Sequence, residues 1–390
     1  MNDRLVWLVK NSRIYKWIRN SILRLSDSYS FTVSPVLLLL SQHAKGIFNR
    51  YDVVVRYMAI EDIEGTKNGG LGFYHKMQKA RNEYLISAKT RIRKEDLNQN
   101  KQGVLTKLVE SFRKEGYRSD IPISVNANLK LIDGSHRLAC ALYFKTKSVM
   151  VYKSGTIEID YGLYWFKRYF DSNEVLTIQN IFAIILSQID IKAVLTEILL
   201  REKQVFGRGE FYQSCEEIGI PGQRPTVERY KIYGLDKHLT GDLSVLDIGC
   251  NCGFFTLLIA SKVKSAVGVE ISQTLVDIAQ VTQVYLGREN VHFLQGNFNS
   301  IKLDHKFDFI CSFAVHHWLG TDMRKYGKRL HNLLNPQGKV LLESQNINDQ
   351  DLDWEEKLVK FRQAGFKEVQ SGELKDDGVI ERCFSVLQKV

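Results

Sequence analysis

An acid, a glycine loop and a second acid stand at the spacing used to hold a nucleoside cofactor. Asp247 is followed by Gly249 and Gly253, and Glu270 lies 21 residues beyond Gly249. Because glycine has no side chain, a cofactor can approach the backbone closely at such a loop. A carboxylate about 20 residues further along suits hydrogen bonds to ribose hydroxyls. These residues predict a pocket for a nucleotide-like cofactor.

Two adjacent histidines, His316 and His317, follow a later apolar run. If that run is a strand of a parallel sheet, both residues lie at the carboxyl edge, where ligands of such sheets bind. An imidazole can accept a proton near pH 7, so either residue could act as a general base toward a hydroxyl acceptor. A purely structural role for the pair is the alternative.

A third polar group lies at the turn Asp133-Gly134-Ser135-His136-Arg137. The residues after the turn predict a helix over 135–144, with Ser135 as its cap. A helix N-terminus presents N–H groups and partial positive charge, which favour a bound phosphate. Asp133, Ser135, His136 and Arg137 are therefore a candidate phosphate site, and a capped turn with a surface arginine is the alternative.

The C-terminal third consists of short apolar runs that alternate with helical stretches. Runs rich in branched residues are typical of buried parallel strands. Strands are expected at 243–248, 266–269, 291–294, 307–312, 339–343, 366–369 and 383–387. In such an α/β domain the glycine loop, Glu270 and the histidine pair would meet at one sheet edge.

This series resembles the class I S-adenosylmethionine-dependent methyltransferases, which have a seven-stranded Rossmann-like sheet. Three of the family's motifs are matched by the strings VLDIGCNCGFF, VGVEIS and FDFICSFAVHHW. The loop reads D-x-G-x-x-x-G, whereas dinucleotide-binding proteins carry G-x-G-x-x-G. The resemblance implies S-adenosylmethionine as cofactor, with these residues around it: Asp247, Gly249, Cys250, Asn251, Gly253, Glu270, Asn297 and Phe298.

The resemblance also implies roles for these residues. Asp247 and the glycine loop would face the methionine part, Glu270 would take the ribose, and Asn297 and Phe298 would flank the adenine. Many members have Asp where this chain has Asn297, and the amide oxygen can still accept a hydrogen bond there. Upstream, residues 219–230 resemble the segment before methyltransferases of carbohydrate and cell-envelope gene products. Arg224 in that segment could reach a ligand or belong to a structural lid.

The middle of the chain, IPISVNANLKLIDGSHRLACA at 121–141, resembles the ParB-like/sulfiredoxin-like nucleotide-binding fold. That resemblance implies a small α+β domain that binds ATP or another nucleotide, with Mg. Some members phosphorylate small molecules, which requires a further acid. Glu83 and Glu110 are weak candidates for that acid, so kinase activity stays open.

The net charge of +10 is concentrated near the N-terminus, where residues 1–60 carry +6. A basic amphipathic helix is expected at 5–25, and such a helix suits peripheral contact with an anionic membrane, or docking on its own domain. Val36 to Leu40 is too short to cross a bilayer and is expected in a core. The six scattered cysteines indicate a cytoplasmic protein with reduced thiols and no metal site.

Four parts are therefore expected: a basic amphipathic segment at 1–60, a ParB-like α+β domain at 61–158, a helical connector at 159–210 and a methyltransferase domain at 211–390. The favoured function is methylation of a hydroxyl or phosphate on a cell-envelope glycan or small metabolite, at the inner face of the membrane, which places the chain in polysaccharide biosynthesis. The alternative is a nucleic-acid methyltransferase with a ParB-like DNA-binding or regulatory module. Nucleic acid is the less favoured partner, because the catalytic half shows no dense Lys/Arg stripe and no base-methylation motif after the fourth strand.

Overall fold

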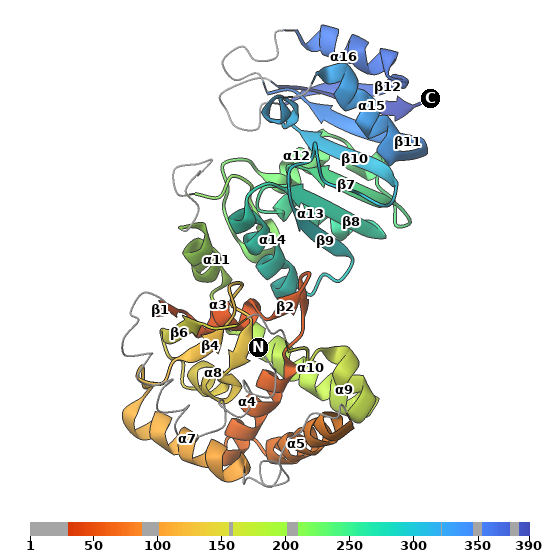
Figure 1. Cartoon of the computed structure of the whole chain (residues 1–390). Coiled ribbons are helices and arrows are strands. Elements are labelled where there is room, and N and C mark those ends of the chain that lie inside the picture. The colour runs from red at the N-terminus through yellow and green to blue at the C-terminus, as the bar shows by residue number, and fades with distance from the viewer. Residues whose placement is uncertain are drawn as a thin grey trace, which may run out of the picture. The chain divides into compact units, whose positions relative to one another are not determined.

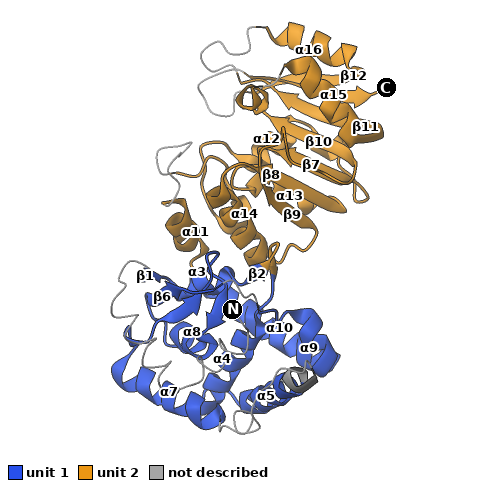
Figure 2. Ribbon diagram, viewed as in Figure 1, with its two compact units in different colours: residues 1–43, 48–189 blue, residues 44–47, 190–390 orange. Residues whose placement is uncertain are grey.

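The computed structural model describes residues 30–87, 101–155, 159–200, 210–320, 322–345, 353–374 and 382–390. The chain divides into two compact units, shown in Figure 2. Unit 1 comprises residues 1–43 and 48–189, and unit 2 comprises residues 44–47 and 190–390. The helix expected at 5–25 lies outside the described residues. Within the described ranges, no helix combines the length and the apolar character needed to cross a membrane.

Unit 1 surrounds a small mixed sheet with helices (Figure 1). Its elements are β1 (Ser30–Val33), α3 (Pro35–Leu40), β2 (His43–Ala44), β3 (Ile47–Phe48), α4 (Tyr51–Ile63), α5 (Gly70–Ser87), α7 (Lys101–Glu115), β4 (Ile123–Val125), β5 (Leu131–Asp133), α8 (Ser135–Tyr143), β6 (Val149–Lys153), α9 (Leu163–Tyr169) and α10 (Ser172–Ser187). The sheet has the order β1-β6-β4-β5, in which β4 and β6 are parallel and the other neighbours antiparallel. Residues 44–47 are grouped with unit 2, although they belong to the β2–β3 pair.

Two expected boundaries differ from this division. Residues 30–43 and 48–60 are part of unit 1, where β1 pairs with β6 and the apolar side chains of α3 are buried. The expected connector at 159–210 is also divided, since α9 and α10 belong to unit 1 and the following helix belongs to unit 2. Apolar contacts, rather than the concentration of basic residues, decide where these segments pack.

The helix–strand–strand–helix–strand order expected between 104 and 152 is confirmed by α7, β4, β5, α8 and β6. The cap of α8 is a correction. Gly134 occupies the capping position with a φ of 108°, a conformation that favours glycine. Ser135 is the first residue of the helix, and its hydroxyl accepts a hydrogen bond of 2.7 Å from Arg50 Nη2.

Unit 2 is an α/β domain built on one continuous sheet (Figure 1). Its elements are α11 (Ile191–Leu199), the short 3-10 helices η2 (Glu216–Ile218) and η3 (Leu235–Lys237), α12 (Thr226–Ile232), β7 (Ser244–Ile248), α13 (Phe254–Ala260), β8 (Ser265–Glu270), α14 (Gln273–Leu286), β9 (Val291–Gln295), β10 (Phe307–Phe313), η4 (His316–Leu319), α15 (Met323–Leu333), β11 (Leu334–Glu343), α16 (Trp354–Gln363), β12 (Phe366–Leu374) and β13 (Arg382–Lys389). The sheet order is β12-β13-β11-β10-β7-β8-β9, and β13 runs antiparallel to both of its neighbours. The expected Rossmann-like fold is confirmed.

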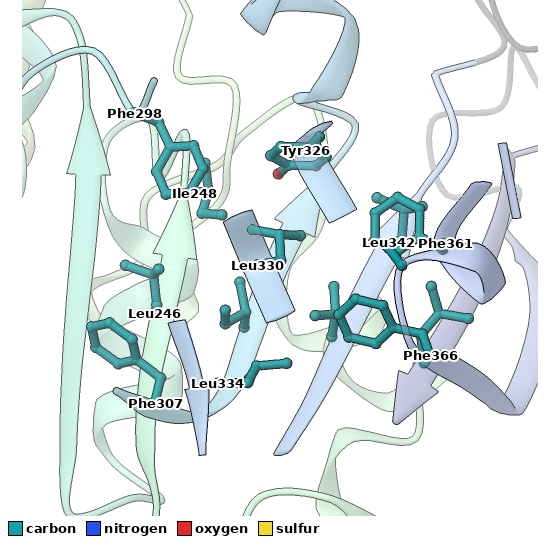
Figure 3. Close-up of a cluster of buried hydrophobic side chains, with 14 of the residues drawn as sticks. Leu246, Ile248, Phe298, Phe307, Tyr326, Leu330, Leu334, Leu342, Phe361 and Phe366 are labelled. Atoms are coloured by element: carbon teal, nitrogen blue, oxygen red, sulfur yellow. The ribbon is translucent and has the colours of Figure 1, made fainter. Parts of the chain in front are cut away.

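One face of the sheet carries an apolar cluster. Leu246 and Ile248 of β7 and Leu342 of β11 point into this cluster, which α15 and α16 complete, as Figure 3 shows. Because successive side chains of a strand point to opposite faces, Asp247 and Glu343 point to the other face. That face also carries buried apolar side chains, and both carboxylates are buried there.

Glu343, at the carboxyl end of β11, is fully buried among arginines. Arg224 Nη2 donates to its Oε1 at 2.7 Å, Arg229 Nη2 donates to its Oε2 at 3.2 Å, and Arg382 Nη1 lies 3.5 Å from Oε1. The Tyr233 hydroxyl also donates to Oε2, at 2.9 Å. Although burial alone would raise the pKa of Glu343, the arginines lower it to about 2. The carboxylate thus joins the segment before β7 and strand β13 to the centre of the sheet.

We expect Glu343→Gln to lower the free energy of unfolding by about 3–5 kcal/mol, because the change leaves buried arginines without their carboxylate. Urea unfolding of the full chain at pH 7 measures this, with the exposed Glu373→Gln on β12 as control. The pKa of Glu343 falls from 4.5 to about 2 on folding, so its contribution is complete above pH 4.5 and is lost as the pH falls toward 2. The difference between wild type and variant should therefore shrink over that range. Equal stability of the two proteins at pH 7 would contradict the assignment.

Candidate active site

The loop between β7 and α13 has a backbone conformation that few residue types adopt. Gly249, Asn251 and Gly253 have φ values of 67°, 54° and 71°. The N–H groups of Gly249 and Cys250 both donate to the Val269 carbonyl, at 2.8 and 3.1 Å. These bonds tie the loop to β8 and turn the chain sharply at the end of β7.

The glycines of this loop are required by packing as well as by φ. A Cβ at Gly249 would lie 2.6 Å from Val315, and one at Gly253 would lie 2.6 Å from both Ala279 and Phe293. At these two positions the sequence predicted open space for a cofactor, but protein side chains occupy that space. Cys250 is buried, and it shapes the loop through the hydrogen bond from its backbone N–H to the Val269 carbonyl.

Asp247 is a buried carboxylate with one oxygen committed and one available. Its Oδ2 accepts a hydrogen bond of 2.6 Å from the Thr256 hydroxyl of α13. Its Oδ1 is buried and has no hydrogen-bond partner among the described residues. Burial raises the pKa of Asp247 to about 7, against the opposing effects of Thr256 and the Arg229 charge. An oxygen in this situation suits a cationic hydrogen-bond donor from a ligand.

Glu270 ends β8 beside the loop, and its carboxylate organises backbone N–H groups. Oε2 accepts from Asn251 N at 2.9 Å, and Oε1 accepts from Ile271 N at 2.8 Å and Ser272 N at 3.1 Å. Each carboxylate oxygen has two lone pairs, so Oε1 is fully used and Oε2 keeps one lone pair for a ribose hydroxyl. Asn251 is positioned in the same way, since its side-chain oxygen accepts from Cys252 N at 2.8 Å.

Asn297 and Phe298 follow β9 and differ in exposure. Asn297 is exposed, and its Oδ1 accepts from Asn299 N at 2.9 Å, which fixes the turn after the strand. Phe298 is buried in the apolar cluster, where its ring packs edge-on against Tyr326 and under the Arg329 guanidinium at 4.7 Å. The contacts of Phe298 thus support the floor of the site, and its adenine role stays a prediction.

His316 and His317 lie on η4, directly after the carboxyl end of β10. His316 is 2% exposed, whereas His317 is only partly buried, and their ring centroids are 5.0 Å apart. The next residue, Trp318, is 61% exposed. Because β10 pairs with β7 with Cys311 opposite Asp247, the histidines emerge at the sheet edge that carries the loop. His317 is the more exposed residue of the two, although both of its ring nitrogens are buried.

The segment before β7 contributes residues that the sequence did not assign. Gln213 is buried, and its Oε1 accepts a hydrogen bond of 3.1 Å from Phe255 N at the start of α13. Arg224 is 1% exposed and bonded to Glu343, so it belongs to the structural lid and not to a ligand surface. The sequence did not predict a role for Thr256, Gln213 or Glu343. Its only signal for them was a lone polar residue inside or beside an apolar run.

The four residues of the candidate phosphate site in unit 1 fall into two groups. Arg137 donates to the carbonyl oxygens of Ile121 and Pro122 and forms an ion pair of 3.1 Å with Asp133. Ser135 and His136 instead contact buried side chains: Arg50 donates to the Ser135 hydroxyl, and the Tyr74 hydroxyl lies 2.8 Å from His136 Nε2. The structure therefore brings two of the four together with residues that the sequence did not single out.

One helix is an exception to the expected lack of a basic stripe on the catalytic half. In α15, Arg324, Lys325 and Lys328 are exposed, and Arg329 donates to the Ile301 carbonyl at 2.8 Å. No acidic residue lies within α15. This helix begins a few residues after η4.

Comparison with known proteins assigns a family to the site region. A family model described as "Methyltransferase domain" matches residues 245–338, which span the glycine loop, Glu270 and the histidine pair. The U6 snRNA methylphosphate capping enzyme Amus of Drosophila melanogaster is 28% identical over 190 residues, covering 40% of this chain and 63% of that protein. The uncharacterized methyltransferase YcgJ of Bacillus subtilis is 35% identical over 100 residues, covering 25% of this chain and 39% of that protein.

A crystal structure of the Bacillus subtilis YcgJ protein aligns with this chain at 19% identity and a TM-score of 0.35. The alignment covers 41% of this chain and 98% of that one. The matches to the Drosophila melanogaster and Bacillus subtilis relatives each cover less than two thirds of that relative's length. The C-terminal unit carries a class I S-adenosylmethionine-dependent methyltransferase domain, as the sequence predicted.

The residues present fit S-adenosylmethionine. The buried Oδ1 of Asp247 suits the ammonium group of the methionine part, and Glu270 stands where ribose hydroxyls are expected. When bound, the cofactor supplies an electrophilic methyl group, and the protein supplies position and charge.

We expect Asp247→Asn to weaken binding of S-adenosylhomocysteine by about tenfold or more, because one charge-assisted hydrogen bond is lost. Isothermal titration calorimetry at pH 8 measures the affinity. Asp308→Asn is the matched control, since Asp308 accepts from Ser244 at the start of β7, the opposite end of the strand.

The same variant should be at least as stable as the wild type at pH 8. Burial raises the pKa of Asp247 from 3.8 to about 7 on folding, so its contribution to stability is complete below pH 3.8 and is lost as the pH rises through 7. Asn does not ionise and escapes this loss. Unchanged affinity in Asp247→Asn, with normal folding, would exclude Asp247 from the cofactor site.

Proposed function

We propose that this chain transfers the methyl group of S-adenosylmethionine to an oxygen of a hydroxyl or phosphate group, on a glycan or small molecule of the cell envelope. The observation that carries the proposal is the position of His317, partly buried and just beyond the sheet edge that holds Asp247 and Glu270. An in-line displacement breaks the bond between sulfur and methyl as the new bond to oxygen forms. A hydroxyl acceptor must also lose its proton, and His317 would take it.

Phosphate deserves equal weight with hydroxyl as the acceptor group. The fruit-fly relative is named a methylphosphate capping enzyme, which describes that protein. A phosphate oxygen is already ionised at neutral pH and needs no base, so a phosphate acceptor would leave His317 with a positioning role. The two acceptor groups therefore make opposite predictions for this histidine.

Nucleic acid is the second candidate acceptor. The relative's name refers to an RNA, and α15 presents Arg324, Lys325 and Lys328 to solvent. Clustered cations favour a phosphate backbone. The resemblance of residues 219–230 to segments of cell-envelope methyltransferases favours the glycan or metabolite, and we rank that acceptor first.

We also propose that unit 1 is a ParB-like domain that binds a phosphate-bearing ligand, with ATP or another nucleotide and Mg as the first choice. Support comes from the motif at 133–137 and from the confirmed order of β5 and α8. The basic amphipathic helix expected at 5–25, which lies outside the described residues, would hold the chain against an anionic membrane at the inner face, where the glycan acceptor is assembled.

The acceptor is tested by incubating the full chain with labelled S-adenosylmethionine and lipid, glycan, metabolite and nucleic-acid fractions of the source cell. We expect label in a glycan or metabolite fraction. With a hydroxyl acceptor, His317→Ala should lower kcat by about 10²–10⁴-fold, the size of a general-base effect. With a phosphate acceptor the loss should be small.

His316→Ala reports on the buried neighbour, and the exposed His292→Ala on β9 is the control. Label confined to nucleic acid would support the second candidate. Turnover on a hydroxyl that is unchanged in both His316→Ala and His317→Ala would eliminate the base.

A further inference from the structure

Unit 1 buries arginines in excess of the carboxylates that could neutralise them. Arg50 and Arg56 are 3% and 2% exposed, and Arg81 of α5 is partly buried beside them. Asp52 is the buried carboxylate that contacts this group, and it is 1% exposed. We call these four residues the arginine cluster. None of its arginines was singled out by the sequence.

Two of the arginines share the Asp52 carboxylate. Arg50 donates to it through Nε at 2.7 Å and Nη2 at 3.1 Å, and Arg56 Nη1 donates to Oδ2 at 2.8 Å. Despite burial, the two guanidinium groups lower the pKa of Asp52 to about 2. Asp52 is therefore ionised, and its single charge is divided between two cations.

The cluster reaches the first turn of α8. Arg50 Nη2 donates to the Ser135 hydroxyl at 2.7 Å, which leaves the hydroxyl proton available to another acceptor. Arg56 Nε is buried and has no hydrogen-bond partner among the described residues. A helix start adds N–H groups and partial positive charge at the same place.

The remaining neighbours supply no negative charge. Arg81 Nε donates to the Tyr161 hydroxyl at 3.1 Å, and the Tyr161 ring lies 5.1 Å from the Arg81 guanidinium carbon. His136 contacts the Tyr74 hydroxyl, and burial with the nearby charges of Arg56 and Arg81 lowers its pKa, so it is neutral. Among the described residues, three guanidinium groups thus face one carboxylate.

An excess of buried positive charge is costly unless an anion compensates it. The penalty is visible at Arg56, where burial lowers the pKa to about 10 even with Asp52 in contact. Arginine remains charged at that pKa near pH 7, so the charge persists. A tetrahedral oxyanion with two charges matches the imbalance, and guanidinium groups bind phosphate with good geometry.

We propose that the arginine cluster and the first turn of α8 bind a phosphate group, with Arg56 Nε and the Ser135 hydroxyl as its donors and Arg50 holding Ser135 in place. The inference rests on the proposed phosphate-binding role of unit 1 and assigns it to Ser135 of the motif together with Arg50 and Arg56, which lie outside the motif. It also removes Arg137 from the site, because Arg137 is engaged with Asp133 and two carbonyl oxygens.

The test is a titration of the full chain, in phosphate-free buffer, with inorganic phosphate and separately with ATP. Calorimetry gives affinities, and the thermal midpoint gives an independent reading, since a ligand that binds only the folded state raises it. The variants are Arg56→Met, which removes the charge but keeps the length, and Ser135→Ala, which is mild enough to fold. Arg118→Met is the matched control, because Arg118 lies on the surface of unit 1 beside Asp120.

Phosphate should raise the thermal midpoint of the wild type and of Arg118→Met to the same extent. Arg56→Met and Ser135→Ala should each bind phosphate about tenfold more weakly or worse, as expected for loss of one hydrogen bond to a charged group. No response of the wild type to phosphate, or wild-type affinity in both variants, overturns the proposal. Should Arg56→Met fail to fold, Ser135→Ala alone decides.

Two further readings separate this inference from the proposed function. ATP that binds no more tightly than inorganic phosphate would contradict a nucleotide ligand and leave the phosphate site standing. S-adenosylhomocysteine affinity, measured on the same samples, should be unchanged in every variant, because unit 2 holds that site.

Discussion

Burying a carboxylate among arginines is the interaction on which both units of this protein depend. In unit 2, Glu343 fixes Arg224 and Arg229 from the segment before the first strand, and in unit 1 Asp52 joins Arg50 to Arg56. A charge removed from water must be compensated by partners held at short range, so each carboxylate dictates where its arginines go. Such a contact constrains the chain far more than an apolar contact of the same area. If either partner is displaced, the other is left as a buried charge without compensation.

The active site follows from this arrangement and from the sheet. Alternation along β7 puts Asp247 on the face opposite the apolar cluster of Figure 3, and Thr256 of α13 donates a hydrogen bond to only one of its oxygens. The carboxyl ends of the parallel strands then bring Glu270 and the histidine pair to the same edge. The site is thus prepared for a cofactor with an ammonium group and ribose hydroxyls, while the acceptor side is left to η4 and its exposed Trp318.

The two units favour ligand groups of opposite charge. In unit 2, the buried Asp247 has one oxygen without a hydrogen-bond partner among the described residues, which favours a cationic group. In unit 1, the guanidinium groups outnumber the carboxylate beside them, which favours an anion. If the acceptor carries a phosphate, the same chemical group would be recognised by unit 1 and methylated by unit 2. That reading links the proposed acceptor with the arginine cluster through one ligand chemistry.

The sequence by itself determined the α/β domain and predicted which residues would surround its cofactor. Strand periodicity and the loop from Asp247 to Gly253 are local signals, because they follow from backbone conformation and from the alternation of side chains. The middle elements from α7 to β6 were also local and were confirmed. The sequence could not determine which polar residues would become partners across long separations. Gln213 meets α13, Arg224 meets Glu343, and Arg50 meets Ser135 only after folding, since each contact joins segments tens of residues apart. The same reason explains why the two units divide the chain differently from the boundaries expected at 60 and 159, which rested on charge and composition. The cap of α8 was instead decided locally, by the left-handed conformation of Gly134.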